Sequence, residues 1–248
     1  MQSFDRCICI AQARVIAGRV KEPHICTIAY HEPTDQMLRF CLPFRLNRTP
    51  DVKRWQRFDF QGDKSDLGND NRRETWHFGQ VSRKHGAITD KTKAEIHRKI
   101  LAHYRYEHEL NEQKASIGIL IPNGPLKLWQ EHLSPGDPED AVEIERGRLM
   151  AEKGIWYPDF KVYIRGYRLI DGVRKPFQKM LVAWDVYEAI RIGKVNPFQA
   201  IYGYRNPYII TGNLATQRRA FICIGLLSAP DGAIQQSAIN QQLKLLPA

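Results

Sequence analysis

The chain has 248 residues, of which 43% are hydrophobic, and its 37 Lys and Arg against 27 Asp and Glu give a net charge of +10. A chain of this length can bury the core of one large domain or two ordinary ones, and its positive surface favours a polyanionic partner, nucleic acid first of all. The first residues lack the features of a signal peptide and no apolar run reaches the length of a membrane span, so the sequence argues against a membrane protein.

The cysteines are typical of small buried hydrophobes rather than of a metal site or a disulfide framework. They number five, and Cys7, Cys9 and Cys223 lie within apolar runs. No C-x-x-C pair is present, and Cys7 and Cys9 would lie on the same face of one strand. We therefore expect no zinc site and a reducing, cytoplasmic location.

Several short runs in the first part of the chain are typical of β-strands. Residues 7–15, 25–30 and 37–42 are rich in β-branched or aromatic side chains and are separated by turn-forming segments. In residues 55–60, apolar and polar side chains alternate as in a half-buried strand. Short strands at this spacing predict a small barrel.

A helix is predicted after these strands. Thr89 and Asp90 can cap it, and the apolar residues from Ala94 to Leu110 recur at spacings nearer 3.6 than 2. We place the helix at 90–112, within an N-terminal β-barrel-like domain of residues 1–133. The acidic segment 134–147 contains Pro and Gly, and we expect it to be an exposed connection.

The second half of the chain is also rich in predicted strands. They lie at residues 160–169, 178–182, 208–212 and 221–227. The pair Asp171-Gly172 predicts a hairpin turn after the first of these strands, and residues 184–191 have helical character. We therefore expect a second β-rich domain at 148–248. The predicted fold class is mixed and β-rich (α+β), with two small barrel domains and a helical insert.

The most suggestive feature for function is a set of basic residues with tryptophans among them. The set consists of Arg45, Arg48, Lys53, Arg54, Trp55, Arg57, Arg72, Arg73, Trp76, Arg83 and Lys84. Basic side chains neutralise phosphates, and exposed aromatic rings stack on bases with about 1–3 kcal/mol per base. We therefore predict that this surface binds DNA or RNA. In the competing interpretation, Trp55 and Trp76 belong to the core and the charges form a solvated strand face.

The basic residues of the predicted helix are less informative. Glutamates lie among them, and spacings such as Glu95 to Lys99 form ordinary helix pairs. His97, His103 and His108 lack the i,i+4 spacing of a helical metal pair, and we expect them to face solvent. The sequence therefore predicts no metal site on this helix.

A metal-dependent nuclease centred on Asp159 is the alternative function. A Pro-Asp pair with later acidic residues and a lysine can hold magnesium for phosphodiester cleavage. The strand after Asp159 lacks the E-x-K or D-x-K step that this chemistry needs. The chain also lacks the P-loop, dinucleotide-binding, nucleophile-elbow and zinc-protease motifs, so we expect no catalytic residue and no cofactor.

Several short phrases resemble a group of uncharacterised bacterial proteins described as containing dual OB-like domains. The phrases are Leu42-Pro43-Phe44-Arg45, Asp70 with Arg72-Arg73-Glu74-Thr75-Trp76, Ser116-Ile117-Gly118-Ile119, Tyr157-Pro158-Asp159-Phe160, Ala183-Trp184-Asp185-Val186-Tyr187 and Arg219-Ala220-Phe221-Ile222-Cys223-Ile224-Gly225-Leu226. The resemblance implies OB-like β-barrels, a fold that commonly presents a barrel face to single-stranded nucleic acid.

The leading expectation is therefore a non-catalytic nucleic-acid-binding protein, acting alone or as a subunit of a larger complex. A third alternative is a protein-interaction adaptor in a mobile-element or defence assembly, whose basic face meets nucleic acid held by a partner protein.

Overall fold

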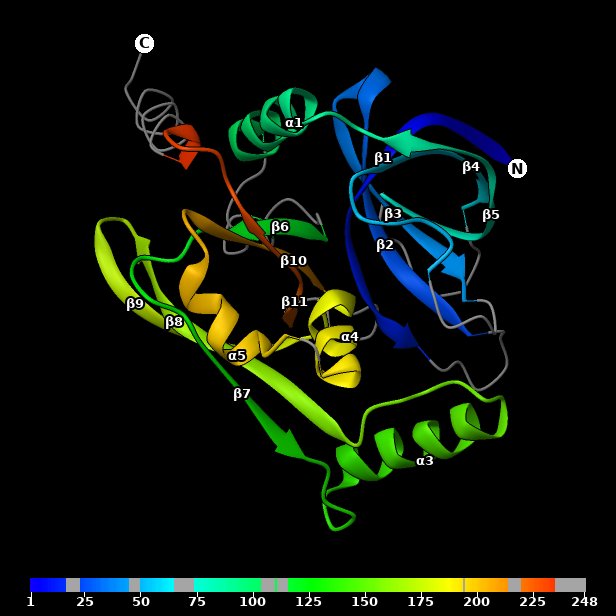
Figure 1. Cartoon of the computed structure of the whole chain (residues 1–248), viewed down its shortest axis with the longest axis vertical. Coiled ribbons are helices and arrows are strands. Elements are labelled where there is room, and N and C mark those ends of the chain that lie inside the picture. Colours follow the sequence, from blue (N-terminus) through cyan, green and yellow to red (C-terminus); the bar gives the residue numbers. More distant parts are fainter. Residues whose placement is uncertain are drawn as a thin grey trace.

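The structure is a computed structural model, and it describes residues 1–16, 23–44, 50–64, 74–103, 110, 116–193, 195–213 and 220–234. These residues form two β-sheets, with helices at their junction and along their edges (Figure 1). The predicted β-rich character of the chain is confirmed.

The first sheet contains five strands that close on themselves. They are β1 (Gln2–Ile16), β2 (His24–His31), β3 (Gln36–Pro43), β4 (Gln56–Asp63) and β5 (Thr75–Ala87), with a short 3-10 helix, η1 (Glu32–Thr34), between β2 and β3. The strand order is β1-β2-β3-β5-β4, and β4 pairs back with β1 to complete the barrel. All neighbouring pairs are antiparallel except β3 and β5, which run parallel.

The barrel interior follows from the alternation of the strands. Phe58 and Phe60 of β4 point inward with Phe40 of β3, and the ring centroids of Phe40 and Phe60 lie 4.1 Å apart. Cys7 and Cys9 line the same interior, where burial raises the pKa of both thiols, that of Cys9 to about 12. Both therefore act as apolar side chains, as their sequence context predicts.

The second sheet contains six strands and is open. It consists of β6 (Ile117–Leu120), β10 (Pro207–Asn213), β11 (Phe221–Ser228), β9 (Val173–Leu181), β8 (Phe160–Ile170) and β7 (Lys127–His132), in that spatial order. Asp171 and Gly172 join β8 to β9 with φ angles of 52° and 75°. Positive φ at both positions is what a two-residue hairpin turn requires, so the hairpin predicted there is confirmed.

The outer face of β1–β2–β3 is covered by the second sheet and by helix α1 (Asp90–His103). Ile28 and Met37 on the barrel belong to one buried cluster with Ile119, Ile210 and Ile224 of the second sheet. Burial of this apolar surface from both sides is the main force that joins the two sheets. Figure 1 shows α1 lying across the junction.

Buried Arg39 of β3 adds a polar connection across the junction of the two sheets. Its guanidinium donates to the main-chain oxygens of Asn213 at 3.1 Å and Ser116 at 2.8 Å, and its side chain is 2% exposed. An ionised side chain buried in this way is stable because main-chain oxygens replace water as its partners.

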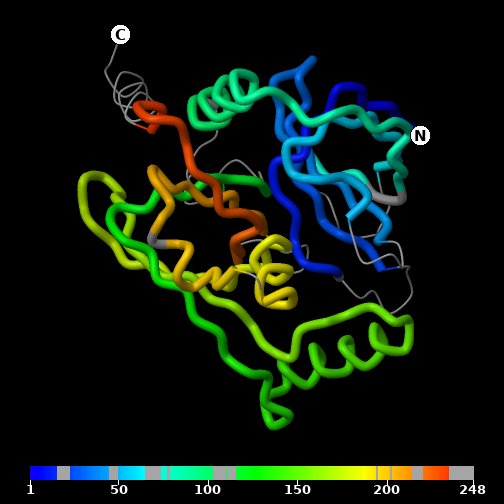
Figure 2. The backbone as a smooth tube through the Cα atoms, in the orientation of Figure 1, coloured from blue at the N-terminus to red at the C-terminus, as the bar shows by residue number. Residues whose placement is uncertain are grey.

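Three helices cover the remaining edges. They are α3 (Pro138–Glu152), α4 (Trp184–Ile192) and the short α5 (Pro197–Ala200), which continues into the 3-10 helix η2 (Ile201–Gly203). The Asp137 side chain caps α3 by accepting from the main-chain N–H groups of Glu139 and Asp140. Figure 2 shows α3 beneath one end of the barrel.

Helix α3 closes that end of the barrel. Met150 of the helix and Ile155 after it belong to the same buried cluster as the barrel interior. Glu143 of α3 forms an ion pair with Arg14 of β1 and accepts a 2.7 Å hydrogen bond from the Tyr157 hydroxyl. The barrel therefore has one end sealed by apolar packing and ionic contacts.

The structure corrects several sequence-based predictions. A second small barrel is wrong, because the second sheet is open and six-stranded. Strands β6 and β7 lie within the predicted first domain, 1–133, yet they pair with the sheet of the predicted second domain, 148–248. The predicted connection at 134–147 holds most of helix α3. Of the helix predicted at 90–112, residues 90–103 are helical, and most of the remainder lies outside the described residues.

Candidate nucleic-acid interface

The predicted interface on the barrel is only partly described. Arg45, Arg48, Arg72 and Arg73 lie outside the described residues. The other seven predicted residues lie on or beside β4 and β5.

The two tryptophans of the predicted interface pack inward. Trp55 has a φ of 64°, its main-chain N–H donates to the Cys9 oxygen at 2.7 Å, and its ring lies 4.9 Å from that of His97. Trp76 is 9% exposed and contacts Phe4 in the barrel interior, with ring centroids 4.7 Å apart. Neither ring stands on the surface among the arginines, which is the arrangement of the competing interpretation.

Most of the basic residues in this region have acidic partners. Arg57 forms two hydrogen bonds with Glu32 at 2.9 and 3.0 Å, and Lys84 lies 3.0 Å from Asp51. Arg54 lies 3.0 Å from Asp185 and so links the barrel to α4. Lys53 and Arg83 are exposed. Pairing with carboxylates lowers the positive potential that this barrel face presents to a phosphate backbone.

A different surface combines aromatic rings and basic residues in the open. It is the outer face of β7, β8 and β9, which we call the β8 face. Its members are Lys127 and Trp129 of β7, Tyr163, Arg165 and Tyr167 of β8, and Arg174 of β9. Cross-strand pairing places Lys127 opposite Arg165 and Trp129 opposite Tyr163. The β8–β9 hairpin extends on the side of the molecule away from the barrel (Figure 1).

The rings of the β8 face are held in fixed positions by their neighbours. Trp129 and Tyr163 stack, with ring centroids 5.4 Å apart and an interplanar angle of 20°. The Trp129 indole N–H donates to Glu131 at 2.7 Å, which orients the ring. The guanidinium of Arg165 lies 5.7 Å from the Trp129 ring and that of Arg174 lies 4.0 Å from the Tyr167 ring. Such contacts orient guanidinium groups without neutralising their charge.

The β8 face also differs from the barrel in its charge pairing. Lys127, Arg165 and Arg174 are exposed, and within the described part of the chain no carboxylate lies within ion-pairing distance of any of them. Lys161, near the start of β8, is paired with Asp140. Tyr167 is 43% exposed. The β8 face therefore offers exposed cations beside one exposed ring, that of Tyr167, and two half-buried rings, those of Trp129 and Tyr163.

The sequence contains a signal for this face that is independent of the density of basic residues. Alternate residues are aromatic or basic in both Lys127-Leu128-Trp129 and Tyr163-Ile164-Arg165-Gly166-Tyr167, with apolar or small residues between them. That pattern predicts strands with one buried and one functional face. The first of them was not predicted as a strand, so their pairing could not be inferred.

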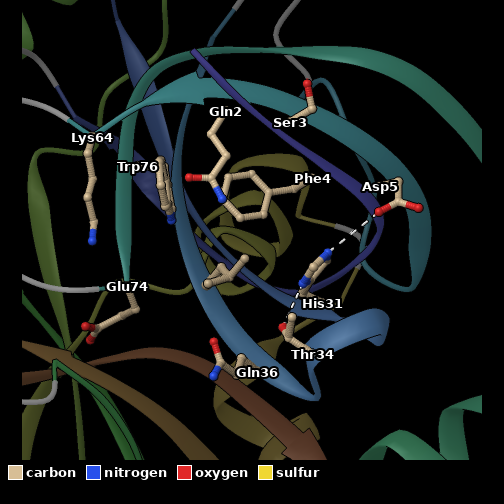
Figure 3. Close-up of a pocket in the computed structure, with 11 residues that line it drawn as sticks. Gln2, Ser3, Phe4, Asp5, His31, Thr34, Gln36, Lys64, Glu74 and Trp76 are labelled. Atoms are coloured by element: carbon tan, nitrogen blue, oxygen red, sulfur yellow. Dashed lines mark hydrogen bonds and ion pairs between the residues drawn. The ribbon is translucent and has the colours of Figure 1, made fainter.

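The barrel end opposite α3 opens into a pocket of about 400 Å³. Phe4, Leu38 and Trp76 supply its apolar wall, and Gln2, Gln36, Lys64 and Glu74 lie around it (Figure 3). The Lys64 ammonium lies 5.3 Å from the Trp76 ring centroid. His31 on another side contacts Thr34 at 2.8 Å and lies 3.9 Å from Asp5. Burial lowers the pKa of His31, so its ring is neutral at pH 7.

The geometry around Asp159 does not assemble a nuclease site from the residues described. Its side chain is 85% exposed, and the imidazole of His132 lies 4.0 Å from its carboxylate. Asp185 instead contacts Arg54, and Glu188 contacts Arg191 at 2.6 Å. No group of three potential metal ligands lies together in the described part of the chain.

The helix histidines are only partly described. His97 is buried, contrary to the expectation that it faces solvent, and its ring bonds to the Tyr208 hydroxyl at 2.7 Å. Burial and the nearby Lys93 lower the pKa of His97 to about 4. The side chain of His103 and all of His108 lie outside the described residues. His97 therefore has a structural role in the junction between the sheets.

Comparisons with known proteins give little guidance. No protein-family model matches the chain, and no curated protein matches it. A solved structure of a replication protein A heterotrimer bound to ssDNA is similar with a TM-score of 0.43 and 10% identity, covering 98% of this chain. The chain spans 51% of that structure's chain. Across the described segments, no helix is both long and apolar enough to cross a membrane.

Proposed function

We propose that this chain is a non-catalytic nucleic-acid-binding protein that holds single strands on the β8 face. One observation supports this proposal above the others. Trp129, Tyr163 and Tyr167 lie together on one sheet surface, next to exposed cations that have no acidic partner among the described residues.

In the proposed complex, aromatic rings stack on bases and basic side chains neutralise phosphates. Tyr163 and Tyr167 are four positions apart on one strand, a separation of about 13 Å, so two bases of one extended nucleic-acid strand can contact both. Stacking contributes about 1–3 kcal/mol per base, and each neutralised phosphate adds a salt-dependent contribution. Rings accept every base, so we expect weak sequence preference.

We further propose that the five-stranded barrel is of the OB type, consistent with its closed Greek-key strand order. An OB barrel commonly binds nucleic acid on the face of its second and third strands. In this chain the outer face of β2 and β3 is buried against the second sheet and α1. The proposed binding surface therefore lies on the second sheet instead. The resemblance to bacterial dual OB-like proteins stays a prediction.

In this proposal, the barrel residues predicted from the sequence contribute less to binding than the β8 face does. Lys53 and Arg83 are exposed and can contact phosphates of a longer strand. Arg45, Arg48, Arg72 and Arg73 belong to the same proposal, in segments that border the described barrel. We assign Arg54, Arg57 and Lys84 a smaller contribution, because each is held in an ion pair.

Binding of labelled oligonucleotides across a salt series tests the proposal. Fluorescence anisotropy should show that single strands bind more tightly than duplex of the same length, since the rings need unpaired bases. The logarithm of the association constant should fall linearly with the logarithm of the salt concentration. Absence of binding at low salt, or binding with no salt dependence, would overturn the proposal.

A nuclease centred on Asp159 remains the catalytic alternative. It predicts magnesium-dependent or manganese-dependent cleavage of DNA or RNA that the Asp159→Ala variant abolishes while the fold is kept. Intact plasmid, single-stranded DNA and RNA after incubation with wild-type protein would eliminate it. The exposure of Asp159, and the absence of any group of three potential metal ligands among the described residues, favour the non-catalytic proposal.

One observation supports a role as an adaptor or subunit of a larger assembly. Leu169 and Val173, at the tip of the β8–β9 hairpin, are 47% and 56% exposed. The register pairs Leu169 with Arg174 and Val173 with Ile170, so the two side chains lie on opposite faces of the tip, and a partner protein that contacts both would enclose it. Co-purification of the tagged chain with partner proteins, and its loss in a Leu169→Ser/Val173→Ser variant, would support the adaptor or subunit role. Retention of the same partners in that variant would show that the hairpin tip does not bind them.

A further inference from the structure

One end of the barrel is filled by apolar side chains, whereas the other end opens into a pocket that the proposed β8 face does not use. One end is filled by Met150 and Ile155, which pack with Val15 near the end of β1. At the other end, where β1 begins, Phe4 and Trp76 border an open pocket of about 400 Å³. Pockets of about 300–1,000 Å³ are typical of small-molecule sites. The open end is therefore a candidate binding site separate from the β8 face.

The pocket contains a hydrogen-bond donor that has no partner among the described residues. The Nε1 atom of Trp76 is buried without an acceptor, and the whole residue is only 9% exposed. Figure 3 shows the Trp76 ring between Lys64 and Phe4. A buried donor left unpaired costs about 1–3 kcal/mol, so a ligand acceptor that reaches Nε1 after a small shift of the ring recovers that free energy on binding.

The rest of the lining defines the chemistry of the ligand. Phe4, Leu38 and the Trp76 ring provide an apolar, largely aromatic wall that suits a flat ring system. Gln2 and Gln36 each carry an amide donor and an amide acceptor, which suit a polar ring edge. Lys64 is exposed beside the Trp76 ring and provides positive charge at the rim.

We propose that this pocket binds one nucleotide, with the base inside against Phe4 and Trp76 and the phosphate at Lys64. The base would accept a hydrogen bond from Trp76 Nε1 through a ring nitrogen or a carbonyl oxygen. This inference takes its ligand class from the proposed function but uses a different surface. A single unstacked or terminal nucleotide of a strand held on the β8 face, or a free nucleotide, meets the same chemistry.

Nuclear magnetic resonance of the five tryptophan indole N–H groups tests the inference in the full chain. The Trp76→Phe variant identifies the Trp76 signal by its loss. Addition of nucleoside 5′-monophosphates up to about 10 mM should shift that signal to saturation, because this concentration is about tenfold above a dissociation constant of about 1 mM, a binding free energy of about −4 kcal/mol. Ribose 5-phosphate is the matched control ligand, since it carries the sugar and phosphate without a base, and it should leave the signal unchanged.

Two variants separate the contributions to affinity, measured by calorimetry on protein with an unchanged circular dichroism spectrum. Trp76→Phe keeps a ring but removes the donor, and it should weaken nucleotide binding about tenfold. Lys64→Gln removes the charge at the rim and should weaken nucleotide binding while leaving nucleoside binding unchanged. An unmoved Trp76 signal, or an equal shift with ribose 5-phosphate, overturns the nucleotide pocket.

The β8 face variant Arg165→Gln/Arg174→Gln distinguishes failure of this inference from failure of the proposed function. It should lose oligonucleotide affinity and keep the nucleotide-induced shift of Trp76. If oligonucleotides bind the β8 face and mononucleotides leave Trp76 unmoved, the pocket proposal fails alone. If mononucleotides shift Trp76 and no oligonucleotide binds at low salt, the proposed function fails and the pocket proposal stands.

Discussion

The outer face of β1–β2–β3 and the β8 face are formed by similar strands, but only the first face is covered by other elements. Both carry large side chains at alternate positions, such as Ile28 and Met37 on the barrel and Tyr163 and Tyr167 on the sheet. The barrel face is buried by the second sheet and α1, whereas the β8 face lies open. Strand alternation therefore shows which side chains share a face, and the packing of other elements decides whether that face meets solvent.

The arginines of the two faces also differ in their partners and in their exposure to solvent. Arg39, on the covered face, donates to main-chain oxygens across the junction and is 2% exposed. Arg165 and Arg174, on the open face, lie over aromatic rings and keep their charge accessible. A buried arginine of the first kind contributes to stability, and an exposed arginine of the second kind is suited to phosphates.

The largest expected effect comes from breaking the covered face. Arg39→Ala should lower the free energy of unfolding by about 3 kcal/mol, because it leaves the Asn213 and Ser116 oxygens without these donors and opens a cavity. Urea denaturation measures the change. Arg83→Ala, at an exposed position of the same barrel, is the control and should stay within about 0.5 kcal/mol of wild type. A loss below about 1 kcal/mol for Arg39→Ala would mean that the junction does not depend on it.

The covered face should also make stability depend on pH. The pKa of His97 is lowered to about 4 in the folded chain, whereas an unfolded histidine has a pKa of about 6.5. Between these values the unfolded state binds the additional proton, so stability is full above about pH 6.5 and falls as the pH drops toward 4. The loss attributable to His97 should reach at most about 3 kcal/mol.

Denaturation curves measured at several pH values test this dependence. His97→Gln, which keeps a polar partner for Tyr208, should be less sensitive to pH in that window. His132→Gln is the matched control, because the His132 side chain is 71% exposed. Equal pH dependence in wild type and His97→Gln would contradict a neutral, buried His97.

A smaller effect is expected on the open face from removal of a ring. Trp129→Ala should weaken single-strand binding about tenfold, in line with about 1–3 kcal/mol per stacked base, while the unfolding free energy changes less. Equilibrium anisotropy measures the affinity. Trp129→Phe keeps a ring and should recover most of the binding. Full affinity in Trp129→Ala would show that bases do not contact this side chain.

The smallest expected effect is that of a single barrel charge. Arg83→Gln should change single-strand affinity no more than about threefold, because it removes at most one peripheral phosphate contact. The same anisotropy assay measures this change. A loss larger than that of Trp129→Ala would move the interface to β4 and β5.

The sequence predicted most strands of the barrel, because β1 to β4 have strong apolar alternation between turn-forming segments. It did not predict β5, which includes polar residues from Gln80 to Lys84, or β7, which is short and polar. Helix α3 was mistaken for a connection because its acidic start and its Pro and Gly suggested an exposed segment. Pro138 and Asp137 instead begin the helix as N1 and N-cap residues.

The candidate site was harder to predict than the fold. Basic density between residues 45 and 84 suggested an interface, but the partners Glu32, Asp51 and Asp185 come from other parts of the chain. The β8 face depends on pairing between β7, β8 and β9, and a single sequence does not give the strand register. Local pattern therefore identified suitable residue types, and long-range packing determined which of them are available to a ligand.

The most direct measurement compares the salt dependence of single-strand binding in two double variants of equal charge change. Arg165→Gln/Arg174→Gln removes two cations from the β8 face, and Lys53→Gln/Arg83→Gln removes two from the barrel. If the β8 face binds the strand, the first variant should reduce the slope of log affinity against log salt by about 1.4, and the second should leave it nearly unchanged. A reduced slope in the barrel variant, with a wild-type slope in the β8 face variant, would contradict the account.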